Sequence, residues 1–158
     1  MLSVPGIVST LIDPLLGLLS DMGHRRRVVL GGGAGFILTL ILFAAAPNFA
    51  VLLAASCLFY PASGAFVSIA QATWMDVEPA STERNMGRWV LAGSTANVLG
   101  PVALTAAVAL GSGWRGATVA AAIMSVPILI SASRLGYPEP HPEAVDLRAA
   151  LRGAIAAL

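Results

Sequence analysis

Asp13 is an acidic residue with apolar sequence on both sides. It is the only ionisable side chain in residues 1–20. A carboxylate at membrane depth is costly unless it faces a water-filled cavity or a polar partner, and such acids are typical of proton relays and of ion or substrate paths. We therefore interpret Asp13 as a site that takes up a proton or binds a substrate cation. The alternative is a structural acid that bonds to a neighbouring helix.

A charged turn follows this apolar run. Residues 17–29 read Gly-Leu-Leu-Ser-Asp-Met-Gly-His-Arg-Arg-Arg-Val-Val, so Asp21 precedes three consecutive arginines. Asp21 follows Asp13 by eight residues, which is about 12 Å along a helix. A carboxylate is stabilised near the positive N-terminal end of a helix. We therefore expect carboxylates at two depths, one in the turn and one within the first apolar run.

Polar residues inside the later apolar runs are weaker candidates. Tyr60, Gln71 and Asn97 could line a substrate path. Hydrogen bonds between helices, worth about 0.6–2 kcal/mol each, are the more ordinary role for such residues. The glycines at 31–33 and Gly35 lack the following lysine and the strand–helix context of a phosphate-binding loop. These glycines are therefore interpreted as positions of close helix packing.

The remaining residues do not favour enzymatic or metal chemistry. Ser63 on a membrane helix would need a base within hydrogen-bond reach to act as a protease nucleophile. Both histidines, His24 and His141, belong to segments outside the apolar runs. The single cysteine, Cys57, excludes an internal disulfide and a zinc site of the clustered-cysteine kind. We expect no enzyme, no metal site, no cofactor and no nucleic-acid partner.

The composition indicates a lipid environment. The 158 residues are 57% hydrophobic and only 11% charged, with a mean hydropathy of +0.82, whereas soluble domains are about 25% charged. A membrane-spanning helix needs roughly 20 apolar residues, and open strands would leave backbone groups unpaired in lipid. The chain is therefore predicted to be an all-α membrane helix bundle over residues 1–134. Its five predicted spans are residues 1–20, 28–46, 49–75, 89–110 and 117–133.

The arginines predict how this bundle lies in the membrane. Eight of the nine fall in the turn 21–27, the loop 76–88 and the tail that starts at Arg134, whereas Arg115 alone falls in the turn 111–116. Cytoplasmic loops carry the excess of basic residues. The three arginine-rich segments are therefore placed in the cytoplasm, at a bacterial plasma (inner) membrane. We also expect the mixed charges of the loop 76–88 to form ion pairs with the arginine turn.

The two ends of the chain are typical of a fragment. With the turn 21–27 in the cytoplasm, Met1 starts outside it, which favours a missing helix upstream. The tail 135–158 first holds three prolines, which cannot sustain a helix. From Val145 onward, apolar residues then alternate with arginines, as in an amphipathic surface helix. We interpret the tail as a cytoplasmic linker.

The charged turn resembles the signature between the second and third helices of the major facilitator superfamily of secondary transporters. That signature reads roughly Gly-x-Leu-Ala-Asp-Arg-x-Gly-Arg-Lys/Arg. It is matched by Gly17, Leu19, Asp21, Arg25 and Arg26. Met22 replaces the first basic residue, and His24 replaces the second glycine. In the family this turn closes the cytoplasmic side of the two halves, so the resemblance implies a gating contact. The alternative is that the arginines set topology alone.

A second resemblance lies in the predicted span 89–110, which looks like the fifth helix of the same family. Gly93, Gly100 and Pro101 are similar to a glycine-proline signature best known in antiporters. The whole resemblance covers about residues 1–134 and implies helices two to six of a twelve-helix plan. The fold it implies is therefore a partial N-terminal half of that superfamily's bundle.

The resemblance implies secondary active transport of a small solute by alternating access, with proton coupling and efflux by antiport among the modes of the family. Five helices form an incomplete half. A transport cycle would therefore need the missing half or a second copy as a partner, besides the lipid bilayer and the solute. The alternative is a non-transporting membrane subunit or a degenerate remnant of a transporter.

Overall fold

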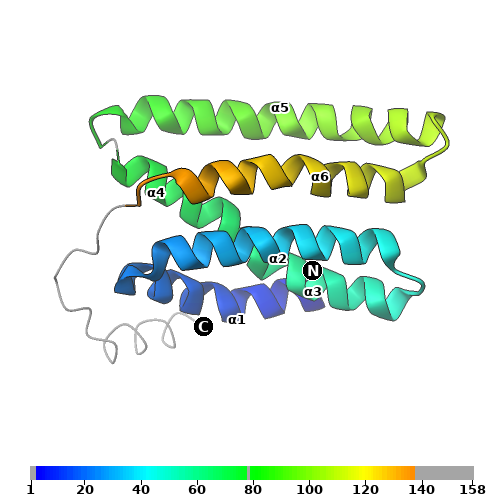
Figure 1. Ribbon diagram of the computed structural model, residues 1–158, viewed down its shortest axis with the longest axis horizontal. Coiled ribbons are helices and arrows are strands. Elements are labelled where there is room, and N and C mark those ends of the chain that lie inside the picture. The colour runs from blue at the N-terminus through cyan, green and yellow to red at the C-terminus, as the bar shows by residue number, and fades with distance from the viewer. Residues whose placement is uncertain (1–2, 78, 138–158) are drawn as a thin grey trace.

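The computed structural model describes residues 3–77 and 79–137, and every regular element in these two ranges is a helix (Figure 1). The elements are α1 (Val4–Leu19), the turn η1 (Ser20–His24), α2 (Arg25–Ala45), α3 (Phe49–Ser63), the π-helical turn η2 (Gly64–Ser68), α4 (Ile69–Val77), the 3₁₀ turn η3 (Pro79–Ser81), α5 (Thr82–Ala109) and α6 (Gly113–Arg134). The predicted all-α membrane helix bundle is confirmed.

Four helical stretches are long and apolar enough to cross a membrane: Val4–Ala45, Phe49–Val77, Pro79–Ala109 and Gly113–Arg134. The first contains 42 residues. As one straight helix it would measure about 63 Å, roughly twice the thickness of the hydrocarbon core. It instead reverses at Gly23, whose φ of 85° is a left-handed conformation that glycine adopts without steric cost. This stretch is therefore the helix pair α1 and α2.

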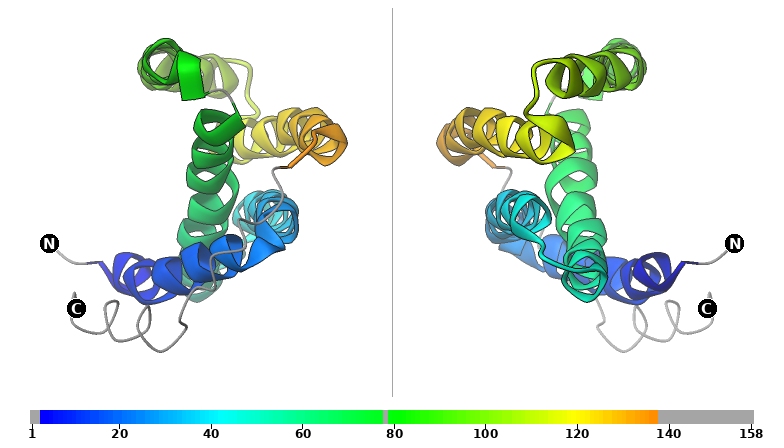
Figure 2. Two further views of the ribbon diagram at one scale, coloured as in Figure 1. Left: turned by 90° about the vertical axis from the view of Figure 1, so that its left-hand side faces the viewer. Right: turned by 90° about the vertical axis from the view of Figure 1, so that its right-hand side faces the viewer.

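Helix α2 lies at the centre of the described bundle. It packs against both α3 and α6, while α1 packs against α3. Figure 2 shows the segment α3–η2–α4 crossing the bundle from the side of α1 to the side of α5. Helix α5 contacts α6 and α4 at the outer edge, and none of its most apolar stretch is buried within the described chain.

Helix α5 differs most from its predicted bounds. It begins at Thr82 rather than at residue 89, and α4 continues to Val77, so most of the predicted loop 76–88 is helical. The hydroxyl of Thr82 donates to the carbonyl oxygen of Pro79 at 2.9 Å where the helix starts. Glutamate, arginine and methionine are good helix formers. The charged residues that predicted a loop at 76–88 are therefore compatible with helix, and they do not end α4 or α5 where the sequence analysis expected.

The remaining bounds differ by a few residues. Helix α6 begins at Gly113 rather than at residue 117, just after the positive-φ Gly111. Helix α2 begins at Arg25 rather than at residue 28. The tail from residue 138 onward, including the predicted amphipathic helix, lies outside the described residues.

Close packing of α2 against its neighbours depends on two glycines. A Cβ atom at Gly32 would lie 2.6 Å from Cβ of Ala65 and 2.8 Å from the backbone nitrogen of Phe66. At Gly33 it would lie 2.6 Å from Cδ1 of Leu129 on α6. Real Cβ atoms essentially never show such distances. The predicted close-packing role is confirmed for these two positions, whereas Gly31 faces open space.

Gly32→Ala is expected to lower the thermal unfolding midpoint of the purified protein in detergent. The added methyl meets backbone that cannot move away, and overpacking of this kind costs about 1–3 kcal/mol. Gly31→Ala is the matched control, because it adds the same methyl one position earlier where nothing lies within 4 Å. Its midpoint should equal or exceed the wild-type value. Equal midpoints for the two variants would contradict the packing.

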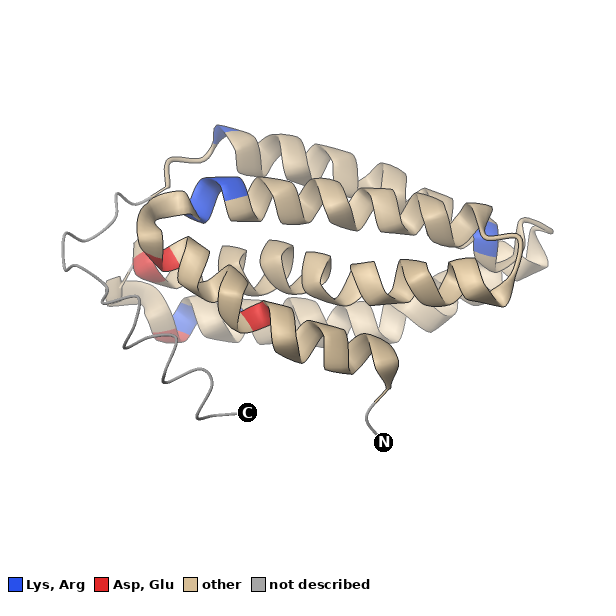
Figure 3. Ribbon diagram, turned by 90° about the horizontal axis from the view of Figure 1, so that it is seen from below, with Lys and Arg blue, Asp and Glu red and all other residues tan. Residues whose placement is uncertain are grey.

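Charged residues gather at one end of the bundle, with a single basic position at the opposite end (Figure 3). The turn η1, the start of α5 and the end of α6 form this arginine-rich end (Figure 1). At the opposite end, Arg115 donates to the carbonyl oxygen of Ala46 at 2.7 Å and lies 5.3 Å from the ring centroid of Trp114. Asp13, the one acidic residue of α1, lies in the interior of that helix.

Candidate functional site

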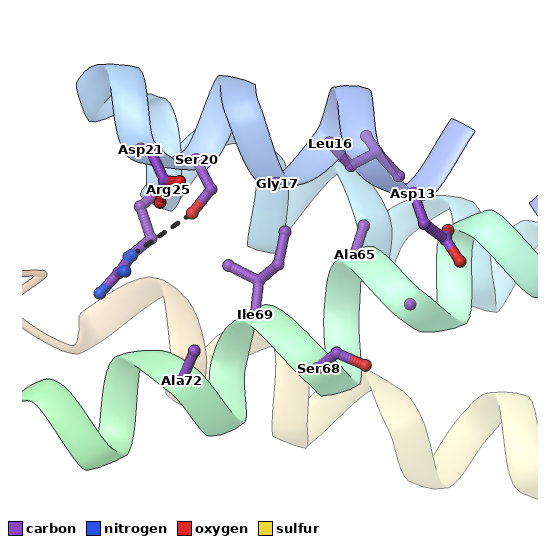
Figure 4. Close-up of a pocket in the computed structure, with 11 residues that line it drawn as sticks. Asp13, Leu16, Gly17, Ser20, Asp21, Arg25, Ala65, Ser68, Ile69 and Ala72 are labelled. Atoms are coloured by element: carbon purple, nitrogen blue, oxygen red, sulfur yellow. Dashed lines mark hydrogen bonds between the residues drawn. The ribbon is translucent and has the colours of Figure 1, made fainter. Parts of the chain in front are cut away.

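A cavity of about 270 Å³ lies between α1 and the segment η2–α4 (Figure 4). Small and apolar side chains form most of its wall, including Leu16, Ala65 and Ile69. Its polar side chains come from α1, η1, the first turn of α2 and η2. They are Asp13, Ser20, Asp21, Arg25 and Ser68. Two of the predicted charged positions, at different depths along the chain, therefore share one cavity.

The carboxyl group of Asp13 points from α1 toward the start of η2 (Figure 4). The hydroxyl of Ser9 donates to its Oδ2 at 2.7 Å. A Cβ atom built at Gly64 would lie 3.2 Å from its Oδ1. Asp13 is nevertheless exposed within the described chain. Because a carboxylate exposed to lipid would be costly, this face of α1 needs water or a polar partner beside it in the membrane.

The turn η2, which faces Asp13, is a feature that the sequence reasoning missed. It interrupts an otherwise regular span with a π-helical turn at Gly64–Ser68. Pro61, buried near the end of α3, has no backbone N–H to donate within that helix. Single π turns inside α-helices occur frequently at functional sites. The signal that could have found it is the proline with a glycine one turn later inside one apolar run.

Arg25 closes one side of the cavity with two contacts. Its guanidinium forms an ion pair with Asp76 at the end of α4, and its Nε donates to the Ser20 hydroxyl at 3.3 Å. Between residues 3 and 137, with Glu78 excepted, this is the only salt bridge. The predicted ion pairing between the arginine turn and the segment 76–88 is confirmed.

The sequence profile of the Major Facilitator Superfamily matches residues 1–156. The chain belongs to the major facilitator superfamily. No curated protein and no solved structure gives a significant match to it. The superfamily comprises transporters rather than enzymes, so the chain is an integral membrane protein of a family that moves small solutes across membranes.

The superfamily signature in the turn can now be placed residue by residue. Asp21 is exposed and lines the cavity, but the ion pair of Arg25 is made with Asp76. Leu19 is also exposed. The glycine that turns the chain is Gly23, one place before the second glycine of the signature. The departure at His24 therefore leaves the turn itself intact.

Among the described residues, Arg26 does not make the gating contact that the signature implied, but contacts α6 instead. Its guanidinium donates to the carbonyl oxygen of Ser133 at 3.1 Å, which ties the start of α2 to the last turn of α6. Close by, the Tyr137 hydroxyl donates to the carbonyl oxygen of Ala132 at 3.1 Å. Burial raises the pKa of the Tyr137 phenol above its ordinary value, although the Arg26 charge acts in the opposite direction. This contact lies outside the cavity.

Of the other predicted positions, only Gly17 lines the cavity. Nothing in the described chain lies within 4 Å of a Cβ built at Gly17, so no described helix packs closely against it. Gly93 and Gly100 on α5 are equally open, and Pro101 is exposed. Gln71 instead donates to Sδ of Met86 at 3.4 Å. Tyr60 and Asn97 are exposed and lie outside the cavity wall.

In the described part of the chain, the side chains form neither a metal site nor the paired nucleophile and base of a protease. Among residues 3–77 and 79–137, no three His, Cys, Asp or Glu side chains lie close enough together to hold a metal ion. Ser63 is the last residue of α3, and His24 is the last residue of the turn η1. No hydrogen bond joins these two side chains.

Proposed function

We propose that this chain works in secondary active transport of a small solute by alternating access, with Asp13 as the group that takes up the coupling proton or the charge of a cationic solute. The observation that carries the proposal is the exposed Asp13 carboxyl group in the cavity wall, within a helix that is apolar enough to cross a membrane. Acids in such places mark proton and substrate paths, because their charge is costly without a partner.

The charges around the cavity favour a cation. Asp13 and Asp21 line it, and Arg25 is the one basic residue in its wall. The Arg25 guanidinium is already paired with Asp76, which does not line the cavity. The two cavity acids are therefore not neutralised by that arginine. A proton or a cationic solute would compensate this charge, whereas an anionic solute would be repelled.

The proposed cycle needs a protein partner against the described helices. Transport sites of such folds lie near the middle of the membrane, between two pseudo-symmetric halves. The exposed Asp13 face and the open Gly93 and Gly100 on α5 offer surface for such contacts. We propose a second transporter half, or a second copy of this chain, as the partner that completes the cavity.

The transport activity can be tested in proteoliposomes that contain the full-length protein and a pH-sensitive dye inside. Cationic, anionic and neutral solutes are added in turn across an imposed pH gradient. We expect cationic solutes to elicit proton flux, because two unneutralised carboxylates line the cavity. Flux elicited by anionic solutes alone would contradict the role of Asp13. The absence of flux in all three classes would contradict transport by paired copies of this chain, and would leave a separate second half or a non-transporting membrane subunit as the explanation.

We further propose that the arginine-rich end faces the cytoplasm of a bacterial inner membrane, since basic residues are enriched on that side. In a Cys57→Ser background, Met22→Cys and Leu110→Cys place exposed thiols at opposite ends of the bundle. A membrane-impermeant thiol reagent added to intact cells should label Leu110→Cys and spare Met22→Cys. Inside-out vesicles should give the opposite pattern. Labelling of Met22→Cys in intact cells would reverse the assignment.

A further inference from the structure

The two oxygen atoms of the Asp13 carboxyl group have different surroundings. Ser9, one turn earlier on α1, is 8% exposed and donates its hydroxyl to Oδ2 at 2.7 Å. This distance is at the upper end of the range of about 2.5–2.7 Å that is usual when a hydroxyl donates to a charged carboxylate. A hydroxyl can both donate and accept, so Ser9 can remain bonded when the carboxyl group gains a proton.

The other oxygen faces the backbone of η2. The three atoms nearest to a Cβ built at Gly64 all belong to the Asp13 carboxyl group, with Oδ1 closest at 3.2 Å. A Cβ atom here would make a tight contact, and the carboxyl group would have to shift by a few tenths of an ångström to admit it. Gly64 is also the first residue of the π turn. The irregular backbone and the missing side chain therefore coincide at the place that Asp13 occupies.

We propose that Ser9 and Gly64 are positioning residues, which hold the Asp13 carboxyl group in one orientation against η2 for proton exchange. This inference rests on the proposed function of Asp13. Ser9 stabilises the charged form by donating a hydrogen bond, and Gly64 excludes any side chain that would turn the group away. The other charged residues facing this cavity are Asp21 from η1 and Arg25 from α2, while the lining of η2 and α4 carries no charge.

The test is the reaction of Asp13 with dicyclohexylcarbodiimide, an apolar reagent that adds to protonated carboxyl groups and stays attached as an N-acylurea. Full-length protein in proteoliposomes is labelled over a series of pH values, and adduct at Asp13 is measured by mass spectrometry. Wild-type labelling should fall with rising pH through one midpoint. Asp13→Asn should give no adduct at this position. An absence of wild-type labelling at every pH would contradict the proposal.

Ser9→Ala is expected to move the labelling midpoint upward by about one pH unit, because the charged form loses a hydrogen bond, and one unit is a ten-fold change in proton affinity. Thr10→Ala is the matched control. It removes a neighbouring hydroxyl that donates to the carbonyl oxygen of Gly6 instead of to Asp13, so its midpoint should match the wild type. Ser9→Thr keeps a hydroxyl and should restore the midpoint.

Gly64→Ala is expected to change the labelling rate at low pH about two- to ten-fold, since its Cβ would lie 3.2 Å from Oδ1 of Asp13 and the displaced carboxyl group would strain its side-chain torsions. Gly31→Ala adds a methyl where space is open and should leave the rate unchanged. Thermal unfolding midpoints identify variants that fail to fold. If Ser9→Ala fails to fold, the labelling midpoint of Ser9→Thr is compared with that of the wild type instead. Equal labelling midpoints for Ser9→Ala and wild type would overturn the positioning role of Ser9.

The outcomes separate this inference from the proposed function. If Asp13→Asn leaves solute-coupled proton flux unchanged while Ser9→Ala moves the labelling midpoint, the transport role of Asp13 fails and the positioning stands. If Asp13→Asn abolishes flux and Ser9→Ala leaves the midpoint in place, the transport role stands and the positioning fails.

Discussion

Asp13→Asn is expected to abolish solute-coupled proton flux without weakening the fold. The substitution keeps the size of the side chain and an oxygen that can accept from Ser9 at the place of the observed 2.7 Å hydrogen bond. It removes the group that can change charge. Because the amide cannot be protonated at working pH, solutes should no longer drive protons across the membrane. The measurement is the dye response in proteoliposomes that contain equal amounts of variant and wild-type protein.

The thermal unfolding midpoint of the same variant distinguishes a functional acid from a structural one. A carboxylate in the middle of a membrane helix costs about 2.5–3.5 kcal/mol on insertion scales. Its replacement should therefore leave the midpoint unchanged or raise it. A structural acid that holds helices together would give the opposite sign, a lower midpoint. Flux that falls together with the midpoint would contradict the coupling role.

Glu83→Gln provides the control for this experiment. Glu83 is an exposed acid in the first turn of α5 and does not line the Asp13 cavity. The variant removes one carboxylate by the same chemical change at the arginine-rich end. Proton flux should therefore remain at the wild-type level. An equal loss of flux in both variants would show that net negative charge matters, and not the place of Asp13.

The course of the helices could be predicted from the sequence because bilayer thickness and charge act on composition directly. An apolar run of sufficient length must be a helix in lipid, and each predicted apolar span overlaps a helix among the described residues. The same reasoning also identified Asp13, since an acid in apolar sequence needs a partner, whereas Asp21 was identified by its place in the turn signature. The structure places both in one cavity wall.

The contacts of the site could not be predicted, because they depend on how each helix is rotated about its axis. Of the two glycines that line the cavity, Gly64 lies against Asp13, whereas Gly17 faces open space. Ion pairing between the arginine turn and residues 76–88 was predicted, but not that Arg25 and Asp76 form the pair or that Asp76 belongs to the last turn of α4. A continuously apolar helix carries no stripe that fixes its rotation, so the facing residues follow only from three-dimensional packing.

The pair of Arg25 and Asp76 is expected to act as a weak latch that becomes stronger when its charges are exchanged. Arg25 begins α2, and Asp76 is in the last turn of α4. Each charge therefore sits at the helix end that disfavours it, since anions are stabilised at N-termini and cations at C-termini by about 0.3–1 kcal/mol each. The ion pair offsets this, but with side chains 19% and 52% exposed it contributes at most about 1 kcal/mol.

The double variant Arg25→Asp/Asp76→Arg keeps the pair and turns both dipole interactions favourable. We expect it to raise the unfolding midpoint and to slow solute-coupled flux roughly ten-fold, because a gain of about 1–2 kcal/mol favours the latched state. Asp76→Arg alone sets two arginines against each other and should lower the midpoint. Both effects should fade between about 0.01 M and about 1 M salt, as screening shortens from about 30 Å to about 3 Å. A double variant that transports at the wild-type rate with a raised midpoint would mean that the pair stays closed throughout the cycle and is a structural brace.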